Sequence, residues 1–137
     1  MNIFIDCEFN GFCGELISMA LVAENGAEWY EVLPIQGPID DWVKENVMPI
    51  LNKKPIENLY KFQQSLQAFL NQYNNIHIVA DWPEDVALFC KALITGPGKC
   101  IRTPPLTMQV IRIDITSDLP HNALEDARAI YKELTIK

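Results

Sequence analysis

The chain has 137 residues, of which 49% are hydrophobic, and its formal net charge is −7. This length suits one domain over residues 1–137, and no apolar run reaches the roughly 20 residues that a membrane helix needs. The acidic balance argues against an extended duplex-binding surface, because such surfaces carry positive charge. The four cysteines form no Cys-x-x-Cys pair, which argues against zinc and favours free thiols. No signal-peptide pattern opens the chain, so we expect a cytoplasmic protein that does not bind membranes.

The N-terminal quarter has the pattern of three strands. Residues 2–8 and 15–24 are apolar runs separated by the glycine-containing turn 9–14. Asn25-Gly26 is a strong two-residue hairpin signal, and residues 27–33 return as a third strand. These segments predict an antiparallel meander with the first strand inside.

Two helices are expected next. Asp40 suits the N-cap of a short helix that contains Trp42 and ends near Pro49. A longer helix is predicted over about 56–73, because Phe62 and other apolar residues recur there on one face. We expect the Trp42 and Phe62 helices, which carry large apolar residues, to supply a homodimer surface.

The second half alternates between strands and helices. A fourth strand is predicted over 76–80, a helix starts at Pro83, and a fifth strand lies within 107–115. The last helix is predicted over about 123–134. The order βββ-α-α-β-α-β-α predicts an α/β fold, in which a mixed five-stranded sheet of meander and parallel strands is flanked by helices.

Two acidic residues close the first strand. Asp6 and Glu8 stand two positions apart, so on a strand they point to the same face while Cys7 points to the other. Two carboxylates on one face repel each other, and divalent cations relieve that repulsion. Taken alone, the pair is more often a solvated strand end.

His121 and Asp126 lie at the start of the last helix. Pro120 ends the preceding segment, so His121 falls on the approach loop or the first turn, and Asp126 falls about one turn inside the helix. A carboxylate on a rigid helix beside an imidazole on a looser segment suits a metal ligand paired with a general base. A single histidine on a loop is more often an ordinary surface residue, so the assignment depends on Asp126 and the distant acidic pair.

Together the two motifs resemble the first and last motifs of the DEDDh 3′–5′ exonuclease superfamily, which has a ribonuclease H-like fold. The resemblance spans nearly the whole chain. Within the superfamily the opening is most similar to the polyadenylate-specific ribonuclease AS group. The segments that carry this similarity are Asp6-Cys7-Glu8-Phe9, Glu15-Leu16-Ile17-Ser18 and Val22-Ala23-Glu24-Asn25-Gly26.

The superfamily's middle motif corresponds to Ala80-Asp81-Trp82-Pro83-Glu84-Asp85. Asp85 fits the metal-binding aspartate by its spacing from the fourth strand, and Asp81 stands where the family usually has asparagine. We favour Asp85, with Asp81 as the alternative metal ligand or a neighbour that supports the ligands. A purely structural reading has Asp81 cap the following helix, with acidic residues favouring its N-terminus.

The resemblance implies a two-metal-ion hydrolysis of phosphodiester bonds from the 3′ end of single-stranded RNA. Asp6, Glu8, Asp85 and Asp126 would hold two Mg²⁺ ions, with Mn²⁺ as a substitute, because hard divalent cations prefer oxygen ligands. His121 would act as the general base.

The sequence indicates the substrate contacts less clearly than the metal ligands. Phe9 follows the acidic pair, where it and Asn10 would meet a ribonucleotide by stacking or through the 2′-hydroxyl, and Trp82 would stack a base. Packing is the competing role for each. The alternatives to an exoribonuclease are the same chemistry on single-stranded DNA, and a ribonuclease H-like module that binds without cleaving.

Overall fold

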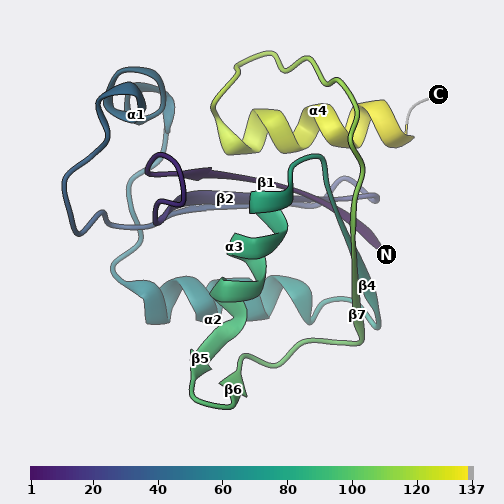
Figure 1. Cartoon of the computed structure of the whole chain (residues 1–137). Helices are drawn as coiled ribbons and strands as arrows, with labels where there is room; N and C mark the ends of the chain where they lie inside the picture. The colour runs from purple at the N-terminus through teal and green to yellow at the C-terminus, as the bar shows by residue number, and fades with distance from the viewer. Residues whose placement is uncertain (136–137) are drawn as a thin grey trace.

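The computed structural model describes residues 1–135, and Figure 1 shows how their elements are arranged. The strands are β1 (Asn2–Phe9), β2 (Leu16–Ala23), β3 (Glu28–Val32), β4 (Ile76–Ala80), β5 (Ile94–Gly96), β6 (Lys99–Cys100) and β7 (Leu106–Val110). The helices are α1 (Asp41–Asn46), α2 (Leu59–Leu70), α3 (Pro83–Leu93) and α4 (Ala123–Thr135), with the short 3-10 helix η1 (Met48–Ile50) after α1. Every helix in this part of the chain is too short or too polar to cross a membrane.

A five-stranded sheet in the order β3-β2-β1-β4-β7 forms the centre of the fold. β1 pairs antiparallel with β2 and parallel with β4, while β2–β3 is antiparallel and β4–β7 is parallel. α4 lies on one side of the sheet, and α2 and α3 lie on the other (Figure 1). The predicted α/β class, the mixed sheet and the central position of the first strand are therefore confirmed, and the arrangement agrees with a ribonuclease H-like fold.

Alternation along β1 decides where its acidic residues point. Ile5 and Cys7 are buried in the core cluster that also contains residues of α2 and α3. Phe4 points the other way and packs in a cluster with the α4 side of the sheet. Asp6 and Glu8 continue the Phe4 face, so the strand carries both carboxylates toward α4.

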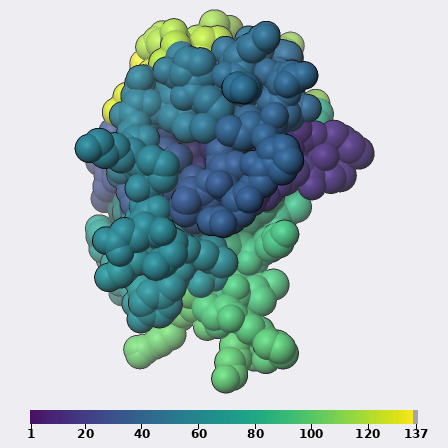
Figure 2. Space-filling model, turned by 90° about the vertical axis from the view of Figure 1, so that its left-hand side faces the viewer, coloured from purple at the N-terminus to yellow at the C-terminus, as the bar shows by residue number. Residues whose placement is uncertain are grey.

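Several local expectations need correction. The predicted long helix starts at Leu59, because the Asn58 side chain caps it by accepting from the Lys61 N–H at 2.9 Å. The hairpin between β2 and β3 has three turn residues, 24–26, rather than two, and Gly26 adopts a φ of +90° there. The β5–β6 hairpin was not predicted. It projects from the body of the molecule (Figure 2, green).

A homodimer surface on the Trp42 and Phe62 helices stays a prediction. The Phe62 side chain itself is fully buried and stacks edge-on against Trp29 at a centroid distance of 5.4 Å, while Leu59 and Tyr60 of the same helix are exposed. Trp42 is 52% exposed, but it faces the candidate site described below. A contact between α2 and a second copy would therefore use Leu59 and Tyr60 rather than Phe62.

The turn after β1 closes so tightly that only glycine fits at residue 14. The Gly14 N–H donates to the Gly11 carbonyl at 3.0 Å, and a Cβ at residue 14 would lie 1.9 Å from the carbonyl oxygen of Asn10. We expect Gly14→Ala to lower the free energy of unfolding by about 2–3 kcal/mol, because the backbone must move to relieve the clash. Urea unfolding would measure the loss. Gly37→Ala is the matched control, since a Cβ there meets no atom within 4 Å. Equal stability of the two variants would contradict the prediction.

Candidate active site

Five carboxylates meet on the α4 side of β1 and form two groups that share Asp6. One oxygen each from Asp6, Asp81 and Asp85 lie within 4.8 Å of one another. One oxygen each from Asp6, Glu8 and Asp126 satisfy the same limit. Four separate elements of the chain contribute these residues, so the cluster exists only in the folded protein.

Each carboxylate lies at the end of a regular element. Asp6 and Glu8 come from the last half of β1, Asp81 directly follows β4, and Asp85 is in the first turn of α3. Asp126 is in the first turn of α4, where its N–H donates to the Asn122 carbonyl at 2.9 Å. Acidic side chains in a first turn also interact favourably with the positive end of the helix, which helps to hold these two carboxylates in place.

Asp85 is fixed to β1 as well as to its own helix. It is 1% exposed, and its Oδ1 accepts a hydrogen bond from the Cys7 N–H at 3.2 Å. Asp81 does not cap α3, since Trp82 occupies the N-cap position and makes no capping side-chain bond. The sequence treated Asp81 and Asp85 as alternatives, whereas the structure brings both carboxylates beside Asp6.

Two buried oxygens in the cluster lack a hydrogen-bond partner in the described part of the chain: Oδ2 of Asp6 and Oδ2 of Asp85. Burial and the neighbouring Asp85 raise the pKa of Asp6 well above its ordinary value. Burial, and then Asp126, raise the pKa of Glu8 to about 9. Burying unpaired carboxylates is costly, and a bound cation removes that cost. Acidic oxygen ligands of this kind fit a hard divalent ion such as Mg²⁺ or Mn²⁺.

A cavity of about 340 Å³ opens onto the carboxylates. Asp6, Asp81, Asp126 and His121 line it, together with the segment 115–117. His121 is exposed and has a φ of +73°, which places it on the loop just before α4. Its backbone N–H donates to Asp126 Oδ2 at 3.2 Å, and its ring packs edge-on against Trp42 at 4.9 Å. The structure thus brings His121 to the same cavity as the acidic residues.

The two aromatic residues expected to contact substrate differ in their surroundings. Phe9 packs against the main core and is only partly accessible. Trp82 is 44% exposed, donates from Nε1 to Glu84 at 3.0 Å, and has the Arg112 guanidinium 4.6 Å from its ring centre. Arg112 also donates to the Asp81 carbonyl at 2.8 Å. Trp82 therefore lies beside the carboxylates with one ring face already covered by a cation.

The side chain of Asn10 is used within the protein. Its Nδ2 donates to the Pro38 carbonyl and its Oδ1 accepts from the Asp40 N–H, both at 2.8 Å. These bonds attach the segment before α1 to the turn after Glu8. The amide is thus occupied by the backbone rather than directed at the cavity.

Sequence reasoning missed three residues near the site. Trp42 was assigned to a dimer surface, Arg112 was one of several scattered cations, and Asn122 was given no role. Asn122 Oδ1 caps α4 by accepting from Glu125 N–H at 3.0 Å, and its Nδ2 donates to the Ile50 carbonyl at 2.8 Å. An Asn three residues before Glu125, and two residues after Pro120, is a capping signal that was present in the sequence.

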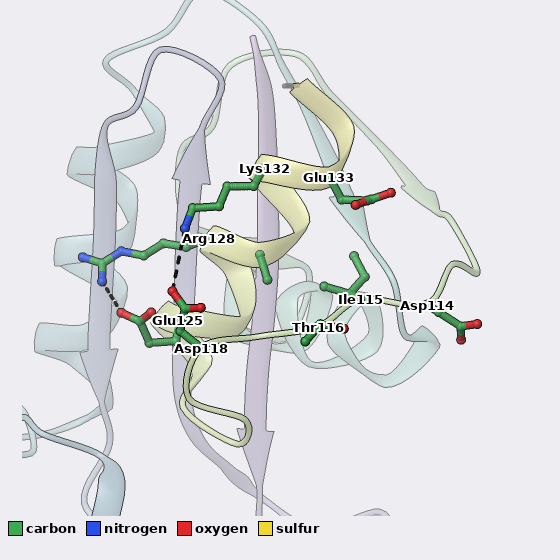
Figure 3. A pocket seen from close by; sticks show the side chains of 9 residues that line it. Asp114, Ile115, Thr116, Asp118, Glu125, Arg128, Lys132 and Glu133 are labelled. Atoms are coloured by element: carbon green, nitrogen blue, oxygen red, sulfur yellow. Dashed lines mark hydrogen bonds and ion pairs between the residues drawn. The ribbon is translucent and has the colours of Figure 1, made fainter. Parts of the chain in front are cut away.

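A second cavity of about 370 Å³ lies between the segment 114–118 and α4, and both contribute side chains to its lining (Figure 3). Its cations are already paired: Arg128 with Glu125 and Glu28, and Lys132 with Asp118 at 3.8 Å. Since these acids neutralise both cations, the cavity is a poor site for a phosphate or another anion.

The fold and the clustered carboxylates define an α/β protein with a candidate divalent-cation site at the end of its central strand. The chain is 35% identical to two proteins of Mycobacterium tuberculosis, 3′-5′ exoribonuclease Rv2179c (strain ATCC 25618 / H37Rv) and 3′-5′ exoribonuclease MT2234.1 (strain CDC 1551 / Oshkosh). Each alignment extends over 158 residues and covers 93% of this chain and 88% of the relative. No protein-family model matches the chain. The chain belongs to the family of 3′–5′ exoribonucleases that these two relatives represent.

Proposed function

We propose that this protein is a metal-dependent exonuclease of the DEDDh type that removes nucleotides from the 3′ end of single-stranded RNA. The observation that carries the proposal is the pair of acidic groups that share Asp6, with His121 on the same cavity. Two-metal-ion phosphodiester hydrolysis uses two cations about 3.5–4 Å apart, and a carboxylate that belongs to both groups favours two such adjacent sites. The similarity of the opening sequence to the ribonuclease AS group, and the names of the two relatives, support RNA as the substrate.

In this proposal Asp6, Glu8, Asp81, Asp85 and Asp126 hold two Mg²⁺ ions. Bound ions would supply activation of a water molecule and stabilisation of the negative charge on the phosphate. His121 would act as the general base that accepts a proton from the attacking water, and its loop position leaves it free to approach the scissile phosphate. The Asp126 carboxylate orients the His121 backbone through the bond to its N–H.

The substrate contacts follow from the position of the cavity. Trp82 is exposed beside Asp81 and offers one ring face for stacking a base. The resemblance to the ribonuclease AS group supports the backbone after Glu8 as the contact for a 2′-hydroxyl, whereas the Phe9 ring packs against the core. The formal charge of −7 favours a short footprint on one strand end, with few phosphate contacts and a shallow salt dependence.

The test uses single-stranded RNA and DNA of the same sequence, each labelled at the 5′ end. With Mg²⁺ we expect a ladder that shortens from the 3′ end, faster on RNA than on DNA, and no cleavage in EDTA or with Asp126→Ala. Glu133→Ala is the matched control, because Glu133 is an exposed acid on the same helix outside both carboxylate groups. A 3′-phosphate on the RNA should block the reaction at its first step.

The competing functions give different results in the same assay. Faster shortening of DNA would assign the enzyme to single-stranded DNA. If both strands stay intact with Mg²⁺ and with Mn²⁺, the catalytic proposal fails. RNA retained by the protein in a filter-binding assay would then support a non-catalytic binding module.

A further inference from the structure

We propose that Trp42 is a positioning residue for His121, and this inference rests on the proposed function. Their rings contact edge to face, with centroids 4.9 Å apart and an interplanar angle of 84°. Trp42 comes from α1, about eighty residues before His121 in the chain. Within residues 1–135, neither nitrogen of the His121 ring has a hydrogen-bond partner, so Trp42 supplies the aromatic contact that limits its rotation.

The backbone of His121 explains why its ring needs such a restraint. Its φ of +73° lies in the left-handed region, so it is neither part of α4 nor part of a strand. Only its N–H is fixed, by the bond to Asp126. The reaction slows when the ring of a general base on such a loop samples unproductive rotamers, because proton transfer requires hydrogen-bond contact with the attacking water.

The segment that carries Trp42 is itself fixed at both ends, and we call residues 38–51 the α1 arm. At its start, Asn10 binds Pro38 and Asp40, and Asp40 caps α1 by accepting from the Trp42 N–H at 3.1 Å. In the middle, Val43 is buried in a cluster with residues of β2 and β3. Val43 therefore anchors the arm to the sheet, and this fixes the backbone that carries Trp42.

At its end the α1 arm is attached to the residue that follows His121. Asn122 donates to the Ile50 carbonyl at 2.8 Å, and Tyr30 donates from its hydroxyl to the Leu51 carbonyl at 2.7 Å. In Figure 2 the arm (blue) lies beside the loop before α4 (yellow-green) at the top of the molecule. One rigid segment thus connects the turn after Glu8 to the loop of the general base, and Trp42 is its contact with the imidazole.

The first measurement is kinetic. We expect Trp42→Ala to lower kcat on single-stranded RNA by about tenfold or more, since a positioned general base contributes roughly 10²–10⁴-fold and a misplaced one loses part of that. KM should change by less than about twofold, and Trp42→Phe should keep most of the rate because it keeps an aromatic ring. Tyr60→Ala is the control, as Tyr60 is a 64% exposed aromatic on α2.

A double-mutant cycle separates positioning from direct RNA contact. In a His121→Ala background, Trp42→Ala should cause less than about a twofold further loss, because the residue on which it acts is gone. If Trp42→Ala lowers kcat in the His121→Ala protein as much as it does in the wild type, or if it raises KM with kcat unchanged, Trp42 acts on the RNA and the proposal is overturned.

An NMR measurement tests the contact without any catalysis. The protein has two histidines, and His77 serves as an internal reference. Its ring nitrogens are hydrogen-bonded to the Thr107 hydroxyl at 2.6 Å and to the Gln109 side chain at 3.0 Å, both on the sheet. We expect Trp42→Ala to move the ring C–H signals of His121 and to leave those of His77 in place. Unmoved His121 signals would overturn the inference, whereas RNA left intact by wild-type protein would overturn only the proposed function.

Discussion

Replacing Asp6 with asparagine should reduce the rate of 3′-end removal by at least about 10³-fold, while the metal-free protein becomes more stable. Asp6 belongs to both carboxylate groups, so the change weakens both cation sites at once. Metal-ion stabilisation of the transition state is worth several kcal/mol, which corresponds to about three orders of magnitude in rate. Single-turnover cleavage of labelled RNA with Mg²⁺ would measure the loss.

The gain in stability has a separate cause. Asp6 is buried, its Oδ2 has no partner in the described structure, and its pKa is raised by burial and by Asp85. An uncharged amide removes that repulsion, so in EDTA the melting temperature of Asp6→Asn should exceed that of the wild type. Asp114→Asn is the matched control, because Asp114 is exposed and outside both groups. Wild-type activity in Asp6→Asn would refute the shared-ligand role.

In EDTA, the thermal stability of the protein should fall as the pH rises from 6 to 9. Burial, and then Asp126, raise the pKa of Glu8 from 4.5 to about 9, and burial and Asp81 raise that of Asp85. The folded protein therefore holds protons that the unfolded chain has released. The stability from these groups is complete below their ordinary pKa values and is lost as the pH rises through the raised ones.

Mg²⁺ should change this dependence, because it binds the deprotonated carboxylates of the folded protein. Melting curves at pH 6, 7, 8 and 9 would show a decrease of at least ~5 °C in EDTA and a smaller decrease, or none, with Mg²⁺. Glu8→Gln, which cannot titrate, should flatten the EDTA curve. A wild-type melting temperature that is constant or rises over this range in EDTA would contradict the pKa shifts.

Periodicity alone predicted the sheet and the position of its acidic pair. The apolar run before Asp6 and the alternation along the strand place both carboxylates on one face, and the later strands and helices follow from apolar spacing and prolines. The β5–β6 hairpin was missed because its strands are only three and two residues long, too short to have a recognisable period.

The sequence named the carboxylates that the structure brings together, but it did not predict how they are arranged. Asp81 and Asp85 appeared as alternatives because spacing along a sequence cannot say that the end of β4 and the first turn of α3 converge on Asp6. Trp42 was misjudged for the same reason. Its apolar ring on a short helix favours a surface or a core equally, and only the tertiary structure brings it to His121.

The carboxylates and the loop that leads to His121 belong to parts of the fold that differ in how well they tolerate substitution and insertion. Asp6 and Glu8 lie on the part of β1 that pairs with β2, and the Cys7 N–H between them donates to Asp85 Oδ1, so the sheet and α3 together hold this backbone. Residues 112–118 are irregular, and 115–117 among them form one wall of the cavity. Loops tolerate substitution and insertion better than the strands and helices that they connect. This wall of the cavity can therefore vary in sequence and length without a shift in the clustered carboxylates.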